Sequence, residues 1–522
     1  MKLSRDAGAL LALLSGAILA ASFTLWDSPI PAYFALVPLL AALEGATPRK
    51  GLALAGLFGL AFFAPSLFWM THVNVLAWIG IVLFMTLQIL PFGALVPFIR
   101  RRLGLPNVAA APILWVAAEF LRSNLATGFP WLLLAYTQHG LPAVIQIADA
   151  GGALAVSFVV MIVNCALADL AAGTGCRRAA VLAAAASLVL AASYGTWRLR
   201  GAENLSGSLK VAIAQGNFPS SLDRDDDPDK VWERYLRLTR EALGSEPDLV
   251  VWPEGAYPWP IQAGDPAAMG ELRSLAKGAG RHFLVGAQTD VRAGESILSY
   301  NSVYLVSPAG SPSGRYDKAH LVPFGEYVPA WVPWRLKALT QDFRSGSPLQ
   351  SPIAFPAGDL GVLICYEDAF PDIAASQVRR GARILAALTS DAWFGRSPEL
   401  SQHLNVCVFR AVENRVPVIR AGNTGISALI DPYGRIYETL SVRGERIGVE
   451  GVLAGRLLAL PAAEETAHTA HTAYTRYGDV FPWACSIAAL LAAALACLAG
   501  KGRRSGAGGA GGFSLDTAPP EE

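Results

Sequence analysis

Residues 361–368 read Gly-Val-Leu-Ile-Cys-Tyr-Glu-Asp, an apolar run that changes abruptly to a cysteine, a tyrosine and two acidic residues. The apolar part predicts the end of a buried strand, and the polar part predicts a turn directly after it. A strand end holds a side chain in a fixed position, which suits a nucleophile. Cys365 is therefore a candidate nucleophilic thiol, although a lone cysteine is more often a small buried hydrophobic residue.

A cysteine needs a base and a cation beside it to react as a thiolate near neutral pH. Residues 248–255, Asp-Leu-Val-Val-Trp-Pro-Glu-Gly, form another short apolar run, and it ends at Glu254. Lys318 stands shortly before a further glutamate, Glu326. Taken singly, a glutamate after a strand is more often a helix cap or a surface charge, and a lysine is usually exposed. The residues become informative as a set, in the chain order Glu254, Lys318, Cys365.

This set resembles the catalytic triad of the nitrilase, or carbon-nitrogen hydrolase, superfamily. The segments Phe-Gly-Glu-Tyr at 324–327 and Asp-Ala-Trp-Phe-Gly at 391–395 are similar to those of the bacterial apolipoprotein N-acyltransferases, in which a nitrilase-like domain is joined to a membrane domain. The resemblance covers nearly the whole chain, from the first apolar segment to the last. It implies a nitrilase-like αββα sandwich, and short apolar runs separated by helical or turn-rich segments between 209 and 430 agree with an α/β layered domain.

The chemistry of such a triad gives each group an expected role. Glu254 is expected to be the general base that takes the thiol proton and returns it to the leaving group. Lys318 is expected to place a positive charge beside the thiolate and the oxyanion, together with a backbone N–H near Tyr366. Glu326 and Glu367 are supporting residues that orient Lys318 or hydrogen-bond the loop, and local capping is the open alternative.

Candidate substrate-binding residues lie in further segments. The Gly-Phe-Pro-Trp segment at 128–131 resembles a loop of the N-acyltransferases, although a tryptophan beside a membrane span is often only an interfacial anchor. The aromatic residues of 391–395 either receive acyl chains or pack in the core. The segment 215–224 carries Arg224 where the family pattern has an aromatic residue, which puts a lid role in doubt, and Trp232 is a candidate substitute. The full set of candidates is Gly128, Pro130, Trp131, Asn217, Trp393 and Phe394.

The composition indicates a membrane protein. Of 522 residues, 53% are hydrophobic and only 16% are charged, which is too apolar for an ordinary soluble protein. The formal net charge of +1 argues against a nucleic-acid partner. With 7 histidines and no HExxH or CxxC spacing, neither a metal nor another cofactor is expected. Cys407 has no strand-end setting and is expected to be structural, since a disulfide with Cys365 would abolish the thiolate chemistry.

Eight apolar segments have about the length that a helix needs to cross a bilayer. They are residues 7–25, 30–46, 51–72, 75–98, 107–125, 143–172, 179–196 and 480–499. Lysine and arginine cluster in alternate connections, and such clusters mark the cytoplasmic side. The sequence therefore predicts a polytopic α-helical membrane domain of about eight spans, with both termini in the cytoplasm and the polar insert on the outer, periplasmic side. The resemblance to the bacterial N-acyltransferases implies that the membrane is the bacterial inner membrane.

The predicted domain limits follow from these segments. Residues 1–197 hold seven spans, 198–478 the periplasmic catalytic domain, 479–500 the eighth span, and 501–522 a disordered cytoplasmic tail rich in glycine and alanine.

The resemblance implies a two-step acyl transfer. Cys365 accepts a fatty acyl group from a phospholipid, and the α-amino group of the S-diacylglyceryl-cysteine that opens an apolipoprotein then attacks the thioester. The expected partners are these two substrates and the bilayer. A membrane-tethered nitrilase-type amidase and a catalytically inactive membrane scaffold are the alternatives: product without a lipid donor distinguishes the first, and an unaffected Cys365→Ser variant the second. A transporter is less favoured, because no clear intramembrane charge pair is seen in the sequence.

Overall fold

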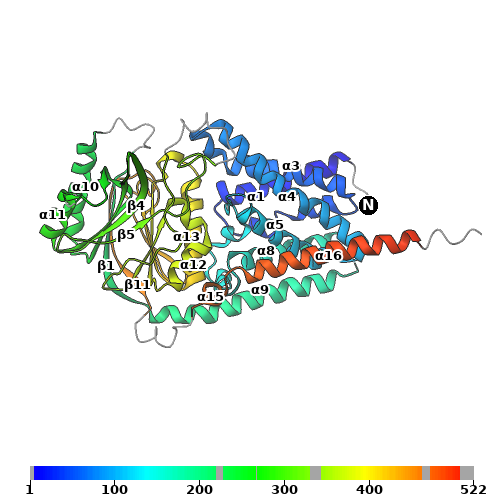
Figure 1. Cartoon of the computed structure of the whole chain (residues 1–522). Helices are drawn as coiled ribbons and strands as arrows, with labels where there is room; N and C mark the ends of the chain where they lie inside the picture. The colour runs from blue at the N-terminus through cyan, green and yellow to red at the C-terminus, as the bar shows by residue number, and fades with distance from the viewer. Residues whose placement is uncertain are drawn as a thin grey trace, which may run out of the picture.

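The computed structural model describes residues 5–173, 175–218, 227–265, 267–329, 342–460 and 471–505. Figure 1 shows two parts stacked end to end, a bundle formed by the N-terminal helices with the last helix, and a layered α/β domain. Arg224 and the chain beyond Ser505 lie outside the described residues, so the predictions made for Arg224 and for the tail remain predictions.

The bundle is built from the apolar segments of the sequence. Its long helices are α1 (Arg5–Thr24), α3 (Pro48–Ser66), α4 (Val75–Leu103), α5 (Asn107–Asn124), α8 (Ala153–Ala171), α9 (Arg177–Leu199) and α16 (Val480–Ser505). Within the described residues, 5 helices combine the length and hydropathy of a membrane span: Asp6–Thr24, Val75–Leu103, Ala153–Ala171, Arg177–Asn204 and Val480–Ala499. The membrane domain is thus supported, while α3 and α5, with 19 and 18 residues, fall outside this set.

One predicted span is interrupted. Residues 30–46 form two short helices, η1 (Pro31–Tyr33) and α2 (Val37–Leu43), rather than one continuous helix. Prolines at the start of each helix favour a new helix start at that point. The 7 residues of α2 rise only about 10 Å, roughly a third of the hydrocarbon thickness. The count of eight spans is therefore not established by the helices themselves.

Another predicted span is shorter than expected. Residues 143–172 divide into α6 (Pro142–Ile145), α7 (Ala148–Gly151) and α8, because Gly152 adopts a positive φ of 70° and ends α7. Only α8 has the length of a span.

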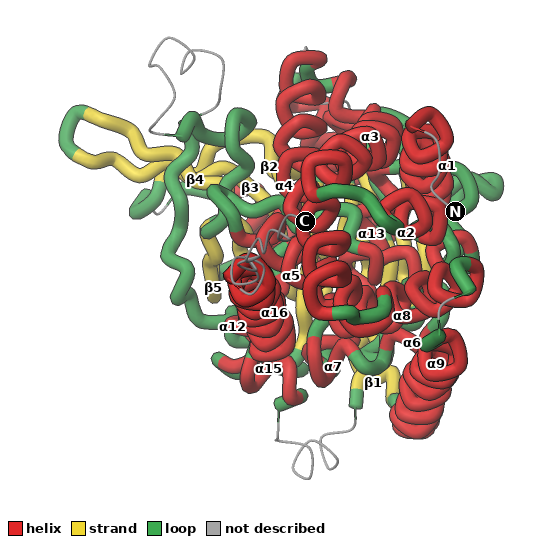
Figure 2. Tube along the Cα trace, turned by 90° about the vertical axis from the view of Figure 1, so that its right-hand side faces the viewer, coloured by secondary structure: helices red, strands yellow, loops and turns green. Residues whose placement is uncertain are grey.

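The two ends of the bundle differ in their contacts. α3 and α4 are joined by η2 (Phe68–His72), which packs on the α/β domain. At the opposite end of α4, Arg100 forms an ion pair with Glu44 at 2.6 Å, and close by Asn107 donates a hydrogen bond to Asp169 at 2.8 Å. Figure 2 looks onto this far end, where α1 begins and α16 ends.

Two sheets form the centre of the α/β domain. The strand order is β11-β1-β2-β3-β4-β5 in the first sheet and β10-β9-β8-β7-β6 in the second. The strands are β1 (Ser206–Gln215), β2 (Leu249–Gln262), β3 (His282–Ala293), β4 (Ser296–Val306), β5 (Pro312–Asp317), β6 (Leu360–Ile364), β7 (Ile384–Thr389), β8 (Val418–Gly422), β9 (Ala428–Ile430), β10 (Ile436–Thr439) and β11 (Gly451–Ala459). β6, β7 and β8 pair in parallel and are buried throughout, which explains their continuous apolar runs.

Helices cover both outer faces, which confirms the predicted αββα arrangement. α10 (Pro228–Leu243) and α11 (Gly270–Ala279) pack on the first sheet, and α12 (Pro371–Arg379) and α13 (Glu399–Asn414) on the second. A separate apolar core fills the space between the sheets; it includes Val211, Val251, Leu284, Val362, Leu388 and Ile419. Trp232 lies in the core beneath α10, packed against Trp252, so it does not supply a rim aromatic in place of the residue at 224.

α13 is enclosed between the second sheet and the bundle, and nearly all of its side chains are buried. Leu404 and Phe409 of α13 belong to the same apolar cluster as the bundle helices. In Figure 1, α12 and α13 form the layer next to the bundle. The two parts of the chain therefore share one core.

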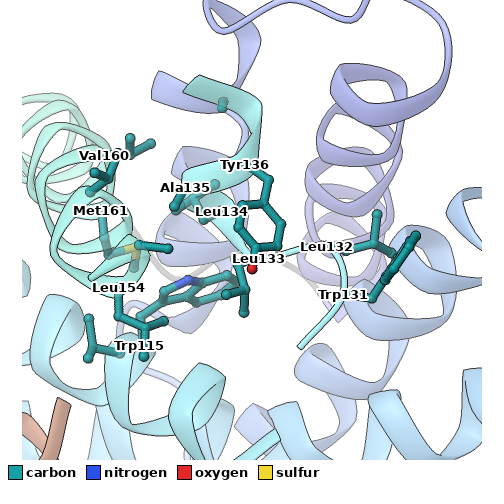
Figure 3. Close-up of a cluster of buried hydrophobic side chains, with 14 of the residues drawn as sticks. Trp115, Trp131, Leu132, Leu133, Leu134, Ala135, Tyr136, Leu154, Val160 and Met161 are labelled. Atoms are coloured by element: carbon teal, nitrogen blue, oxygen red, sulfur yellow. The ribbon is translucent and has the colours of Figure 1, made fainter. Parts of the chain in front are cut away.

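The segment after α5 completes this shared core. Figure 3 shows Trp131 to Tyr136 among side chains of α5 and α8, including Trp115 and Met161. Two charged residues of α5 hold the segment: the Leu134 N–H donates to Glu119 at 2.7 Å, and Arg122 donates to the Leu132 carbonyl at 3.2 Å. Glu119 and Arg122 lie 3.6 Å apart and are buried. They are a buried charge pair in α5 that the sequence did not make evident, and their hydrogen-bond partners indicate a structural role.

Candidate active site

Cys365 stands at the tip of a tight strand-to-helix turn. The five residues of β6 before it are fully buried, and η6 (Cys365–Ala369) begins at the cysteine itself. Cys365 has a φ of +52°, a left-handed conformation that is costly for a non-glycine residue. The turn leaves the thiol half-buried at the sheet edge. The predicted position of Cys365 at a strand end is confirmed.

Glu254 and Lys318 come from the other sheet and meet near this turn. Glu254 lies within β2, and Lys318 directly follows β5. The Lys318 ammonium is 3.6 Å from Glu254 Oε1 and 2.8 Å from Glu326 Oε1, and its side chain is only 1% exposed. The structure therefore brings the predicted base, cation and supporting glutamate together.

The charges of these groups act on one another. Burial raises the pKa of the Cys365 thiol well above its usual value, the Glu254 carboxylate adds to that rise, and Lys318 opposes it. Burial alone would lower the pKa of Lys318, but Glu326, Glu254 and Cys365 together raise that pKa above its ordinary value. Lys318 is therefore a permanent cation, and the resting thiol keeps its proton.

An asparagine that the sequence did not suggest completes the arrangement. Asn301 of β4 donates to Glu254 Oε1 at 2.7 Å and to Glu326 Oε1 at 3.1 Å. The other oxygen of Glu254 accepts from the Ser390 N–H at 2.8 Å. Glu254 is thus fixed by donors from two sheets. Asn301 stands within an ordinary strand sequence, and nothing in its neighbourhood distinguishes it from any other polar strand residue.

Glu367 is a supporting residue of the turn. Its Oε2 accepts from the Ile364 N–H at 2.8 Å, which closes the turn around Cys365. Its Oε1 accepts from the N–H groups of Ala319 and His320 at 2.7 and 3.0 Å. Burial raises the pKa of Glu367 to about 7, although these hydrogen bonds favour its ionised form. Glu367 therefore ties the cysteine turn to the segment that carries Lys318, and the two alternatives weighed for it, orientation and local capping, are both realised.

The Tyr366 side chain reaches the membrane part of the protein. Its hydroxyl donates to the Gly128 carbonyl at 3.1 Å. Its ring lies near Phe129 and Trp131, with centroids 6.0 and 6.5 Å away. Pro130, between these two aromatics, is buried. The predicted loop at 128–131 is thus directly beside the cysteine turn.

The three remaining candidates for substrate contact, Trp393, Phe394 and Asn217, lie in two different places. Phe394, on η7 (Asp391–Phe394), packs edge-on against Trp69 of η2 at 4.7 Å, and Trp393 lies half-buried beside it. Asn217 is bound elsewhere: its N–H donates to the Asn423 carbonyl at 2.9 Å, and its side-chain amide donates to Gly448. We interpret Asn217 as a residue that holds loops at the strand ends.

A buried charged cluster lies behind Cys365. His403 is 2.8 Å from Asp368 and 2.9 Å from Asp391, and Arg420 contacts the same two carboxylates at 2.9 and 3.1 Å. The Asp368 and Asp391 carboxylates outweigh the effect of burial and raise the pKa of His403 to about 10. His403 and Arg420 likewise outweigh burial at Asp391 and lower its pKa to about 2. Two cations therefore balance two anions.

Two further residues adjoin this cluster. Cys407 Sγ lies 3.0 Å from Asp368, and the thiol is buried, in keeping with its expected structural role. Glu399, Asp391 and His403 are buried together, and one possible metal-ligand atom of each lies within 4.8 Å of the others. Burial raises the pKa of Glu399 well above its usual value, and the neighbouring Asp391 carboxylate adds to that rise, which favours the neutral carboxyl.

Comparison with known proteins identifies the family of the chain. Residues 210–451 match the carbon-nitrogen hydrolase family, and residues 15–166 match the apolipoprotein N-acyltransferase N-terminal domain. The protein is therefore an enzyme of the carbon-nitrogen hydrolase class that carries a membrane domain. A relative named apolipoprotein N-acyltransferase, from Geobacter metallireducens, is 38% identical over 93% of this chain and 95% of its own length. Relatives of the same name from Allorhizobium ampelinum and Agrobacterium fabrum are 33% and 32% identical over 88% and 86% of this chain and 91% and 90% of their own lengths. The chain belongs to the apolipoprotein N-acyltransferase family.

Proposed function

We propose that this protein moves a fatty acyl group from a phospholipid, through a thioester on Cys365, to the α-amino group of the S-diacylglyceryl-cysteine that opens an apolipoprotein. The observation that carries the proposal is the hydrogen bond from the Tyr366 hydroxyl to the Gly128 carbonyl. It fixes the residue after the nucleophile to a loop of the membrane domain. An active site in that position suits a donor whose chains stay in the bilayer.

In the first half-reaction, Glu254 takes the Cys365 thiol proton as the sulfur attacks the ester carbonyl of the phospholipid. The raised pKa of the thiol makes this base necessary, because little thiolate exists at rest. Lys318 and a backbone N–H near Tyr366 stabilise the oxyanion. The C–O bond then breaks, Glu254 returns the proton to the departing oxygen, and lysophospholipid leaves.

In the second half-reaction, the α-amino group of the acceptor attacks the thioester carbonyl. Glu254 takes a proton from the attacking nitrogen, the C–S bond breaks, and the sulfur regains a proton. Asn301 and Glu326 hold Glu254 and Lys318 in place during both steps. The same groups therefore serve both directions of proton transfer, as a ping-pong reaction requires.

The proposed orientation places the α/β domain in the periplasm and both termini in the cytoplasm of a bacterial inner membrane. The basic residues support it: Arg100 and its neighbours end α4 at the far end of the bundle, and Arg177 begins α9. With the broken segment of η1 and α2 counted as a crossing, the chain passes the bilayer eight times. This count keeps each basic cluster on one side.

Intact-mass analysis after incubation with phospholipid tests the proposal. Wild type is expected to gain one acyl group that hydroxylamine removes, and Cys365→Ala is expected to gain none. Absence of the adduct on folded wild type would overturn the phospholipid reaction. The amidase alternative predicts turnover of a small amide without lipid, and the scaffold alternative predicts that Cys365→Ser changes nothing.

A further inference from the structure

One side-chain amide in α13 holds several parts of the membrane domain. Gln402 is 5% exposed and lies where α13 faces the bundle. Its Oε1 accepts from the indole N–H of Trp69 at 3.2 Å and from that of Trp131 at 2.9 Å. Its Nε2 donates to the carbonyls of Phe23 and Ser66 at 3.5 and 3.3 Å. Every hydrogen-bonding position of this amide is in use.

The partners of Gln402 come from separate bundle segments. Phe23 lies near the end of α1, Ser66 ends α3, Trp69 lies in η2, and Trp131 follows α5. These segments end at the same side of the bundle, beside the α/β domain. Through the Gln402 side chain, the α/β domain therefore holds these four bundle segments in position relative to each other.

The two indoles also contact Phe394 of η7 and Tyr366, the residue after Cys365. Trp69 packs against Phe394 at 4.7 Å, and Trp131 lies 6.5 Å from Tyr366 and 5.3 Å from His403. Trp69 and Trp131 are themselves 6.1 Å apart. The amide oxygen thus sets the separation of two rings that support Phe394 on one side and Tyr366 on the other.

We propose that Gln402 is a positioning residue for the acyl donor. By holding both indoles, it fixes the rings that pack against Phe394 and Tyr366, and thereby the positions of the two aromatic side chains against which we place the acyl chain of a membrane lipid. Gln402 does not touch the thiol chemistry itself. This inference rests on the proposed acyl-enzyme reaction, and it adds a residue that determines how the acyl chain of the donor is positioned.

The test compares Gln402→Met with wild type. Methionine has a similar length but cannot accept or donate these hydrogen bonds. We expect the KM for the phospholipid donor to rise about tenfold, the factor that corresponds to about 1.4 kcal/mol. The rate at which iodoacetamide, a small water-soluble reagent, alkylates Cys365 is expected to stay within about twofold of wild type, since the triad is unchanged. A merely structural loss would lower donor acylation and alkylation together.

Gln402→Glu gives an independent arm with a pH signature. A glutamic acid in its protonated form accepts from both indoles and donates one hydrogen bond to a carbonyl, whereas the ionised form places a charge opposite two carbonyl oxygens. Burial raises the pKa of such a carboxyl. We therefore expect the KM of this variant to approach that of wild type at pH 6 and to rise toward that of Gln402→Met at pH 8.5.

Gln88→Met is the matched control. Gln88 is a buried glutamine of α4, 5% exposed, and its amide atoms make no hydrogen bond to other described residues. Its replacement is expected to leave the donor KM unchanged. If Gln402→Met forms the acyl-enzyme with the wild-type KM, the inference is wrong while the proposed function stands. If wild type itself forms no acyl-enzyme, the proposed function fails first.

Discussion

At the scale of single residues, the site combines a strained cysteine with a cation that is buried among carboxylates. The Lys318 ammonium forms ion pairs with both Glu254 and Glu326, so two carboxylates lie beside one cation. Burial raises the pKa of the Cys365 thiol, the Glu254 carboxylate adds to that rise, and Lys318 only partly opposes it. We therefore expect the thiol to keep its proton until Glu254 removes it during attack on a substrate carbonyl.

This balance predicts the behaviour of a Lys318→Met variant. Without the cation, the pKa of Cys365 is expected to rise further, so the pH at which iodoacetamide alkylation reaches half its maximum should move upward by at least about one unit. Because the pKa of the wild-type thiol is already well above its usual value, the shift is measured as a fall of at least about tenfold in the alkylation rate at each pH between 7 and 10. Lys318→Met combined with Glu326→Gln restores the local charge balance and guards against misfolding. Lys210→Met, a partly exposed lysine, is the control. An unmoved pH profile would show that Lys318 does not act on the thiol.

The charged cluster behind the cysteine predicts a pH-dependent stability. Because the pKa of His403 is raised to about 10, its stabilising contribution is fully present below about pH 6.5 and is lost as the pH rises through 10. The difference in Tm between wild type and His403→Gln should therefore be largest near pH 6 and narrow toward pH 10. His282→Gln serves as a control, since burial lowers the pKa of His282 and predicts no change in that difference above pH 7. A constant gap for His403→Gln would contradict a charged histidine.

At the scale of elements, α3 and α4 meet where two glycines let the backbones touch. A Cβ at Gly51 would lie 1.9 Å from the Gly93 carbonyl oxygen, and one at Gly93 would lie 2.3 Å from the Gly51 carbonyl oxygen. Small residues that allow such close approach are typical of helix contacts in membranes. η2, which joins these helices, carries Trp69 to the active site. The spacing of α3 and α4 therefore affects the position of Trp69 beside Phe394.

Gly51→Ala tests this contact. The added methyl group has no space, so the helices must separate, and we expect a loss of about 1–3 kcal/mol in unfolding free energy, seen as a lower Tm in detergent. Gly80→Ala is the matched control, because a Cβ at Gly80 in α4 meets nothing within 4 Å. Equal Tm values for the two variants would show that the close approach carries no stability.

At the scale of the whole molecule, the orientation across the membrane is the main prediction. We expect a single cysteine at position 295, in the exposed hairpin between β3 and β4, to react with a membrane-impermeant maleimide in spheroplasts. The native Cys176, exposed just before α9, should react only after the inner membrane is opened. Both are tested in a background with the other cysteines replaced by serine. The reverse pattern would invert the proposed topology.

The sequence predicts features that arise from neighbouring residues in the chain, and it does not predict those that depend on residues far apart in the chain. The sequence predicts the strands near Glu254 and Cys365 because each has a local apolar run, but β2 continues past Glu254 to Gln262, whereas β6 does end directly before Cys365. Gln402 was not found, since its importance comes from indoles 333 and 271 residues away in the chain. Asn301 was missed for the same reason. The segment at 30–46 was predicted as one span because hydropathy does not register where prolines restart a helix.

The enclosure of α13 bears on the order in which the chain is made. The first bundle helices leave the ribosome before any strand of the α/β domain, so they can already be in the bilayer when α13 is synthesised. We expect the apolar face of α13 to pack against Phe23, Leu132 and their neighbours as soon as the helix forms. A gene fragment encoding residues 198–478 alone would produce a protein with that face bare, and we expect it to aggregate. We therefore expect the membrane helices to keep this face of the α/β domain covered from its synthesis onward.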